Sequence, residues 1–114
     1  MDIKLTKDAD TLLVILYKAY LELIDLKGSK NAANFWEDAD FIRNTYFPNV
    51  PREDITELCF ELKRAGFIYG LDSENSLSEI KLTSDAIIYM ENRFQNKVDT
   101  VLDYLAKIKS ILLC

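Results

Sequence analysis

The side chains best placed for chemistry are the charged groups of residues 51–65. Three of them are basic and four are acidic: Arg52, Lys63 and Arg64 against Glu53, Asp54, Glu57 and Glu61. Guanidinium and ammonium groups bind phosphates, whereas glutamates accept hydrogen bonds from cations or from cytosine amino groups. Because the acids outnumber the bases, this stretch suits a phosphate ligand only if its cations gather with others nearby.

The sequence lacks the side chains on which most enzymes depend. It contains no histidine, which removes Ser-His-Asp and Cys-His catalysis and most zinc sites. It contains no GxGxxG or GxxxxGK[ST] phosphate-binding loop. Its two cysteines are too few for a disulfide scaffold or a four-ligand zinc site. We therefore expect a protein that is not an enzyme and that uses no cofactor and no metal ion.

Length and charge narrow the class of protein further. The chain has 114 residues, enough for one domain, and a formal net charge of -5. This charge repels phosphate at long range and does not steer the protein toward nucleic acid. The N-terminus shows no signal peptide, and the apolar run at residues 12–16 is too short to span a membrane. We expect a cytoplasmic protein with no membrane partner.

Residues 51–65, which carry these charged groups, are predicted to form a helix, on which side chains three or four residues apart lie on the same face. Pro51 suits the first position of that helix, and Gly66 suits its end. The spacing predicts that one face packs in the core: Ile55, Leu58, Cys59 and Leu62. The opposite, open face then presents Glu53, Thr56, Glu57, Phe60 and Arg64.

The flanking residues predict further helices and one hairpin. A helix over residues 6–26 begins at Thr6 and ends before Gly28, a short helix follows Ser29, and another covers residues 37–45. Residues 67–71 and 77–82 form strands joined by a polar turn, and Thr83 caps the next helix. The first helix is apolar almost all round, so we expect both its own domain and a partner subunit to cover it. The fold class is mostly α with a small β-hairpin.

The C-terminal residues predict one long helix from residue 84 to about residue 113. Its later apolar positions alternate in steps of three and four, as in a coiled coil: Phe94, Val98, Val101, Leu105, Ile108 and Leu112. A monomer would expose this row to water, so we expect a homodimer that buries it. The pattern leaves parallel and antiparallel pairing open.

Two short strings carry a resemblance to a known class. The run LKRAGFI at residues 62–68 and the run IKLTSDA at residues 80–86 resemble the end of the recognition helix and the wing of winged helix-turn-helix transcription regulators. The layout is similar to that of PadR-like regulators, replication terminator proteins and small winged-helix proteins of phages and mobile elements. The resemblance implies a winged-helix domain over residues 1–83. It also implies that residues 84–114 form a dimerisation helix within the same single domain.

Two functions remain open. The resemblance implies a dimeric DNA-binding transcription regulator, whose DNA-contacting residues would be Arg43, Arg52, Thr56, Lys63, Arg64 and Lys81. The alternative is an acidic winged-helix module that binds a protein rather than DNA, such as an antirepressor or inhibitor of phage origin. Its partner would contact Glu53, Glu57 and Phe60. A continuous basic strip joining Arg43, Arg52, Arg64 and Lys81 would favour DNA, and its absence would favour the protein partner.

Overall fold

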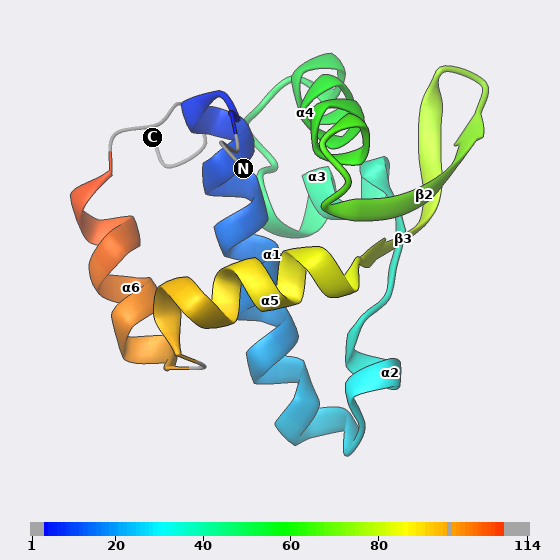
Figure 1. Cartoon of the computed structure of the whole chain (residues 1–114). Helices are drawn as coiled ribbons and strands as arrows, with labels where there is room; N and C mark the ends of the chain where they lie inside the picture. Colours follow the sequence, from blue (N-terminus) through cyan, green and yellow to red (C-terminus); the bar gives the residue numbers. More distant parts are fainter. Residues whose placement is uncertain (1–3, 96, 109–114) are drawn as a thin grey trace.

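A computed structural model of the chain describes residues 4–95 and 97–108, and these form six helices and a three-stranded sheet (Figure 1). The elements are α1 (Lys7–Lys27), α2 (Lys30–Ala33), β1 (Trp36–Asp38), α3 (Ala39–Tyr46), α4 (Arg52–Arg64), β2 (Ile68–Ser73), β3 (Ser76–Leu82), α5 (Ser84–Phe94) and α6 (Val98–Lys107). The predicted fold class, mostly α with a small hairpin, is confirmed at this level.

Helix α1 runs through the centre of the molecule and packs against α2, α4, α5 and α6 (Figure 1). As predicted, the Thr6 side chain caps its start by accepting a hydrogen bond from the Ala9 N–H, and Gly28 ends it with φ 74°. The helix is buried almost all round from Ala9 to Tyr20. Its last two turns are less covered, and Leu21 and Ile24 are only half-buried.

The sheet is antiparallel with the order β1-β3-β2. The sequence does not predict strand β1, because residues 37 and 38 suit the start of the helix that follows. Trp36 pairs with Ile80 of β3, and α3 begins only after Asp38, whose side chain accepts a hydrogen bond from the Phe41 N–H at 2.7 Å. Pairing with a distant strand therefore displaces the start of α3, and local sequence cannot reveal such a partner.

The hairpin turns at Glu74 and Asn75, between the paired residues Ser73 and Ser76. Both turn residues have positive φ angles, 40° and 68°. A two-residue turn of this kind follows the right-handed twist of the strands. The polar turn predicted from composition is confirmed, and it brings Glu74 to the tip of the hairpin.

The single helix predicted over residues 84–113 is wrong in the described part of the chain. Helix α5 ends at Phe94, Gln95 adopts a left-handed conformation with φ 55°, and α6 begins at Val98. The chain turns at this point, and α6 packs against both α1 and α5. Val101 then becomes completely buried within its own chain.

This turn also changes the predicted dimer interface. Phe94 and Val101 are buried in the core of the same chain, and the half-buried Leu105 packs against that core. These three residues are therefore not available to a second subunit in the way the heptad pattern predicted. Val98 and Ile108 are half-buried, and Leu112 lies outside the described residues.

None of the helices that the structure describes combines the length and the apolar character needed to cross a membrane.

Candidate interaction surface

Helix α4 is oriented as its sequence predicts. Ile55, Cys59 and Leu62 are buried in the core, and Leu58, the fourth residue of the predicted core face, is half-buried against it. The helix packs on α1, α3 and both strands of the hairpin. Glu53 and Glu57 are exposed on the other side. The apolar face thus determines which charges reach solvent.

A groove separates the open side of α4 from the tip of the hairpin. It has a volume of about 410 Å³ and is lined by Arg52, Glu53, Thr56, Glu57, Glu74, Asn75 and Ser76. Three of these side chains are carboxylates and one is a guanidinium. The groove is therefore acidic, and an anionic ligand would meet repulsion there.

The guanidinium that lines this groove is already paired. Arg52 donates two hydrogen bonds to the carboxylate of Asp40 on α3, with N–O distances of 2.9 and 2.7 Å. This bidentate pair uses two of the five N–H donors of the guanidinium, and the Asp40 carboxylate offsets its charge. Arg52 therefore joins α4 to α3 and leaves the groove with its negative charge.

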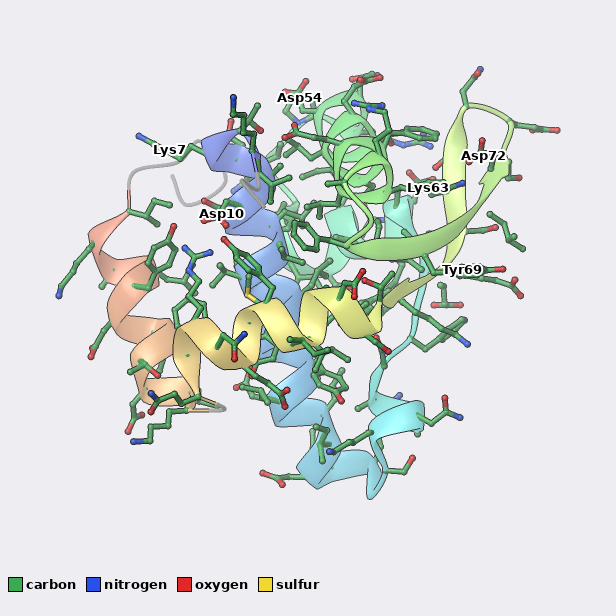
Figure 2. All side chains as sticks on the ribbon, viewed as in Figure 1. Lys7, Asp10, Asp54, Lys63, Tyr69 and Asp72 are labelled. Atoms are coloured by element: carbon green, nitrogen blue, oxygen red, sulfur yellow. The ribbon has the colours of Figure 1, made fainter. Side chains whose placement is uncertain are left out.

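Lys63 is paired in a similar way. Its ammonium group lies 2.7 Å from a carboxylate oxygen of Asp72, and the two side chains meet between α4 and β2 (Figure 2). Both side chains are partly exposed, so the pair contributes only about 0–1 kcal/mol to stability. Its greater consequence is to neutralise a cation that was predicted to contact DNA.

The remaining predicted cations differ in their contacts. Arg43 donates to the Val50 carbonyl at 2.9 Å and to the Asn44 side chain at 3.0 Å, so it supports the turn before α4. Arg64 and Lys81 are exposed and form no ion pair with the residues that the structure describes. Of the four cations in the predicted strip, Arg43 and Arg52 thus contact groups of their own chain, whereas Arg64 and Lys81 are exposed.

Phe60 is not the exposed anchor that the sequence predicted. It is half-buried and packs against the core, because neighbouring elements contact α4 on several sides. Its neighbour Glu61 also contacts another element. The Glu61 carboxylate accepts from the backbone N–H and the hydroxyl of Thr6, at 2.8 and 2.9 Å, and so ties α4 to the start of α1.

Sequence reasoning missed a second surface, on the outer side of the sheet. Tyr69 pairs with Lys81 across the hairpin, and 51% of the Tyr69 surface is exposed. Together with Phe35 and Glu79 these residues line a hollow of about 440 Å³. Successive side chains of a strand point to opposite faces of the sheet, so the position of Tyr69 next to the apolar Ile68 was the signal in the sequence. Ile68 is buried and Tyr69 is exposed. Lys81 therefore lies beside aromatic side chains, away from the groove of α4.

A polar cluster joins α6 to α1 and α5. Arg93 donates two hydrogen bonds to the Asp10 carboxylate, at 2.7 and 3.0 Å, and the Tyr104 hydroxyl donates a third at 2.6 Å. The Arg93 guanidinium also lies 4.4 Å from the centre of the Tyr104 ring. These contacts border a hollow of about 530 Å³ that Lys7, Tyr89 and Ile108 also line.

The ionisation of this cluster follows from its contacts. Burial raises the pKa of Asp10, but the hydrogen bonds from Arg93 and Tyr104 and the charge of Arg93 outweigh it, so the pKa lies below the ordinary value of 3.8. Burial and the hydrogen bond to Asp10 raise the pKa of Tyr104. The cluster is thus an ionised tie between helices, with no group poised to act as an acid or base near neutral pH.

No group of three or more metal-ligating side chains comes together among the described residues. Burial raises the pKa of the Cys59 thiol to about 12, so this cysteine is not a reactive nucleophile. Comparisons of the chain with protein-family models, with curated proteins and with solved structures find no match.

Proposed function

We propose that this protein is a winged-helix protein-interaction module that binds a basic segment of a partner through the groove between α4 and the hairpin. The order of its elements supports the winged-helix assignment. Helices α3 and α4 follow one another across a short turn, and a hairpin follows α4 in a sheet of order β1-β3-β2. In such an arrangement the helix in the place of α4 is the one that enters the major groove of DNA.

The charge of that surface supports a protein partner rather than DNA. Glu53, Glu57 and Glu74 line the groove, whereas DNA-reading surfaces carry lysine and arginine to offset the phosphates. Two cations of α4, Arg52 and Lys63, are paired with carboxylates. The acidic groove is the observation that carries the proposal, because arginine or lysine side chains complement it.

The proposal is tested by fluorescence anisotropy with a labelled peptide rich in lysine and arginine. The Glu57→Gln variant should weaken binding about two- to five-fold, which corresponds to about 0.5–1 kcal/mol for one exposed charge contact. Asp54→Asn is the matched control, because Asp54 is exposed on the same helix but does not line the groove. Both variants remove one negative charge, so only a contact within the groove separates them.

Duplex DNA provides the competing measurement. At about 50 mM salt, where phosphate contacts are strong, the protein should leave a labelled random duplex unbound. Tight DNA binding that weakens steeply with salt would contradict the proposal and support a DNA-binding regulator. An equal loss of peptide binding in Glu57→Gln and Asp54→Asn would contradict it as well, since it would show only general attraction to an acidic protein.

A further inference from the structure

A row of three exposed side chains crosses the sheet at the hollow on its outer side. Tyr69 of β2 pairs with Lys81 of β3. On the other flank of β3, Trp36 of β1 pairs with Ile80. Antiparallel pairing then places Phe35, one residue before Trp36, opposite Lys81. Lys81 therefore lies between two aromatic residues, of which Phe35 is 43% and Tyr69 51% exposed, and all three line the hollow.

Glu79, which also lines this hollow, has a strained backbone. Its φ angle is 51°, in the left-handed region that glycine adopts more easily than any residue with a side chain. The register between β2 and β3 shifts between Tyr69 and Leu71, and there β3 contains one residue more than β2. Such a bulge changes the direction of a side chain, and strain of this kind is common where a side chain has a function.

The two charged residues of the hollow, Glu79 and Lys81, form no ion pair with each other or with any other residue that the structure describes. They are two positions apart on β3, so their Cα atoms lie roughly 6 Å apart. The hollow of about 440 Å³ thus offers a carboxylate acceptor, an ammonium donor and two aromatic rings. Lys81 would repel a cationic ligand and Glu79 an anionic one, whereas a planar ligand with both acceptors and donors complements both groups.

We propose that this hollow binds the guanine base of a free nucleoside or nucleotide. The base stacks on the rings of Phe35 and Tyr69, because aromatic side chains stack favourably with any base. Its O6 and N7 atoms accept hydrogen bonds from the Lys81 ammonium, as guanine does from lysine in general. Its N1–H and its N2 amino group donate to the Glu79 carboxylate. Adenine has no proton on N1, so it offers the carboxylate one donor group instead of two and binds less tightly.

A free nucleotide suits this hollow better than a strand of nucleic acid. Lys81 is the single cation among the described residues that line it. The neighbouring Glu37 is exposed on β1, and the chain carries a net charge of -5, so the further phosphates of a strand would be repelled. This site is separate from the acidic groove of α4, and its ligand is a small molecule rather than the protein segment proposed there.

NMR titration of the full chain with guanosine monophosphate (GMP) and adenosine monophosphate (AMP) tests the proposal, because the two ligands differ only in the base. GMP should shift the amide signals around the hollow and bind at least about five-fold more tightly than AMP. Tyr69→Ala should weaken GMP binding at least about five-fold, since it removes one stacking ring. Leu71→Ala is the matched control, because Leu71 is 44% exposed on the same strand but does not line the hollow. No shifts at about 5 mM GMP, or an equal loss in both variants, would overturn the proposal.

Two changes at Glu79 separate binding from a structural role. Glu79→Gln should remove the preference for GMP over AMP, because the amide lacks the charge and one acceptor oxygen. Glu79→Gly should remove it as well but raise the urea midpoint of unfolding, since glycine adopts a φ of 51° without strain. A Glu79→Gln protein that keeps the preference would overturn the role given to this carboxylate, as would a lower midpoint for Glu79→Gly.

A short single-stranded RNA with one guanine distinguishes the two sources of the base. It should bind no more tightly than GMP, because its additional phosphates meet an acidic protein. Tighter binding that weakens steeply with salt would overturn the assignment of a free nucleotide and identify a single strand as the ligand.

Discussion

The link between Asp10 and Arg93 provides the most direct test of how α6 is held in place. Replacing Asp10 with asparagine keeps the size of the side chain but removes its charge. The change replaces one of the two carboxylate oxygens that accept from Arg93 and Tyr104 with an NH2 group, and the remaining amide oxygen is uncharged and a weaker acceptor. Arg93 would then be a partly buried cation without its counter-ion, because only 24% of its side chain is exposed.

The size of the effect lies between two limiting cases. An exposed ion pair contributes about 0–1 kcal/mol, and breaking a fully buried one costs about 3–5 kcal/mol. The pair is half-buried, and Arg93 would still stack on the Tyr104 ring, an interaction of about 1 kcal/mol. We therefore expect Asp10→Asn to cost about 2 kcal/mol, or roughly a 30-fold change in an equilibrium constant.

The loss should appear first in α6, since a helix of ten residues is not stable alone in water. Amide hydrogen exchange should become roughly 30-fold faster in α6, with much smaller changes in the buried part of α1. Glu22→Ala is the control, because it breaks the exposed pair with Lys18 on the same helix as Asp10 and should cost about 0.3–0.5 kcal/mol. A change below about 0.5 kcal/mol for Asp10→Asn would refute the view that this cluster holds α6.

The wild type and the Asp10→Asn variant should also differ in how their free energy of unfolding depends on pH. Asp10 has a lowered pKa in the folded state, so its contribution is complete above the unfolded value of 3.8 and disappears as the pH falls through the folded value. The stability difference between wild type and Asp10→Asn should therefore be constant from neutral pH to about pH 5 and shrink only in stronger acid. A difference that already shrinks near neutral pH would indicate another titrating group.

Two further predictions concern single positions in and next to α4. Gly66→Ala should destabilise the fold by about 1 kcal/mol in urea unfolding, because φ is 83° there while a methyl group would meet no neighbour within 4 Å. Gly28→Ala, at a φ of 74° and likewise with no neighbour within 4 Å, should cost a similar amount, and a negligible cost at both positions would refute the explanation from backbone strain. Cys59 should react slowly with a thiol reagent in the native state and rapidly in urea, since its pKa is about 12 in the folded core; fast labelling of the native protein would show that this helix opens readily.

The helix ends could be predicted because their causes are local. Thr6 and Thr83 cap α1 and α5 through side-chain hydrogen bonds to residues three positions later, and Gly28 ends α1 in a left-handed conformation. Each signal lies within one turn of the end that it marks. The break at Gln95 carries no such signal, because glutamine rarely adopts a positive φ.

The heptad spacing failed for a different physical reason. Steps of three and four residues predict that one face of a helix is covered, but they do not identify what covers it. In this protein Phe94 and Val101 are covered by their own chain, because the helix breaks at Gln95 and the chain turns there. The uncovered apolar surface instead includes Ile88, which is 54% exposed and which the heptad pattern did not select.

At the candidate site, the sequence likewise shows which residues are charged but not which of them pair. The sequence identified Arg52 and Lys63 as cations on α4 but not their partners, which lie 12 and 9 residues away on other elements. A cation whose partner cannot be identified from the sequence can form an ion pair once the chain folds, and the carboxylate then offsets its positive charge. This pairing explains why a helix with several basic residues borders an acidic groove.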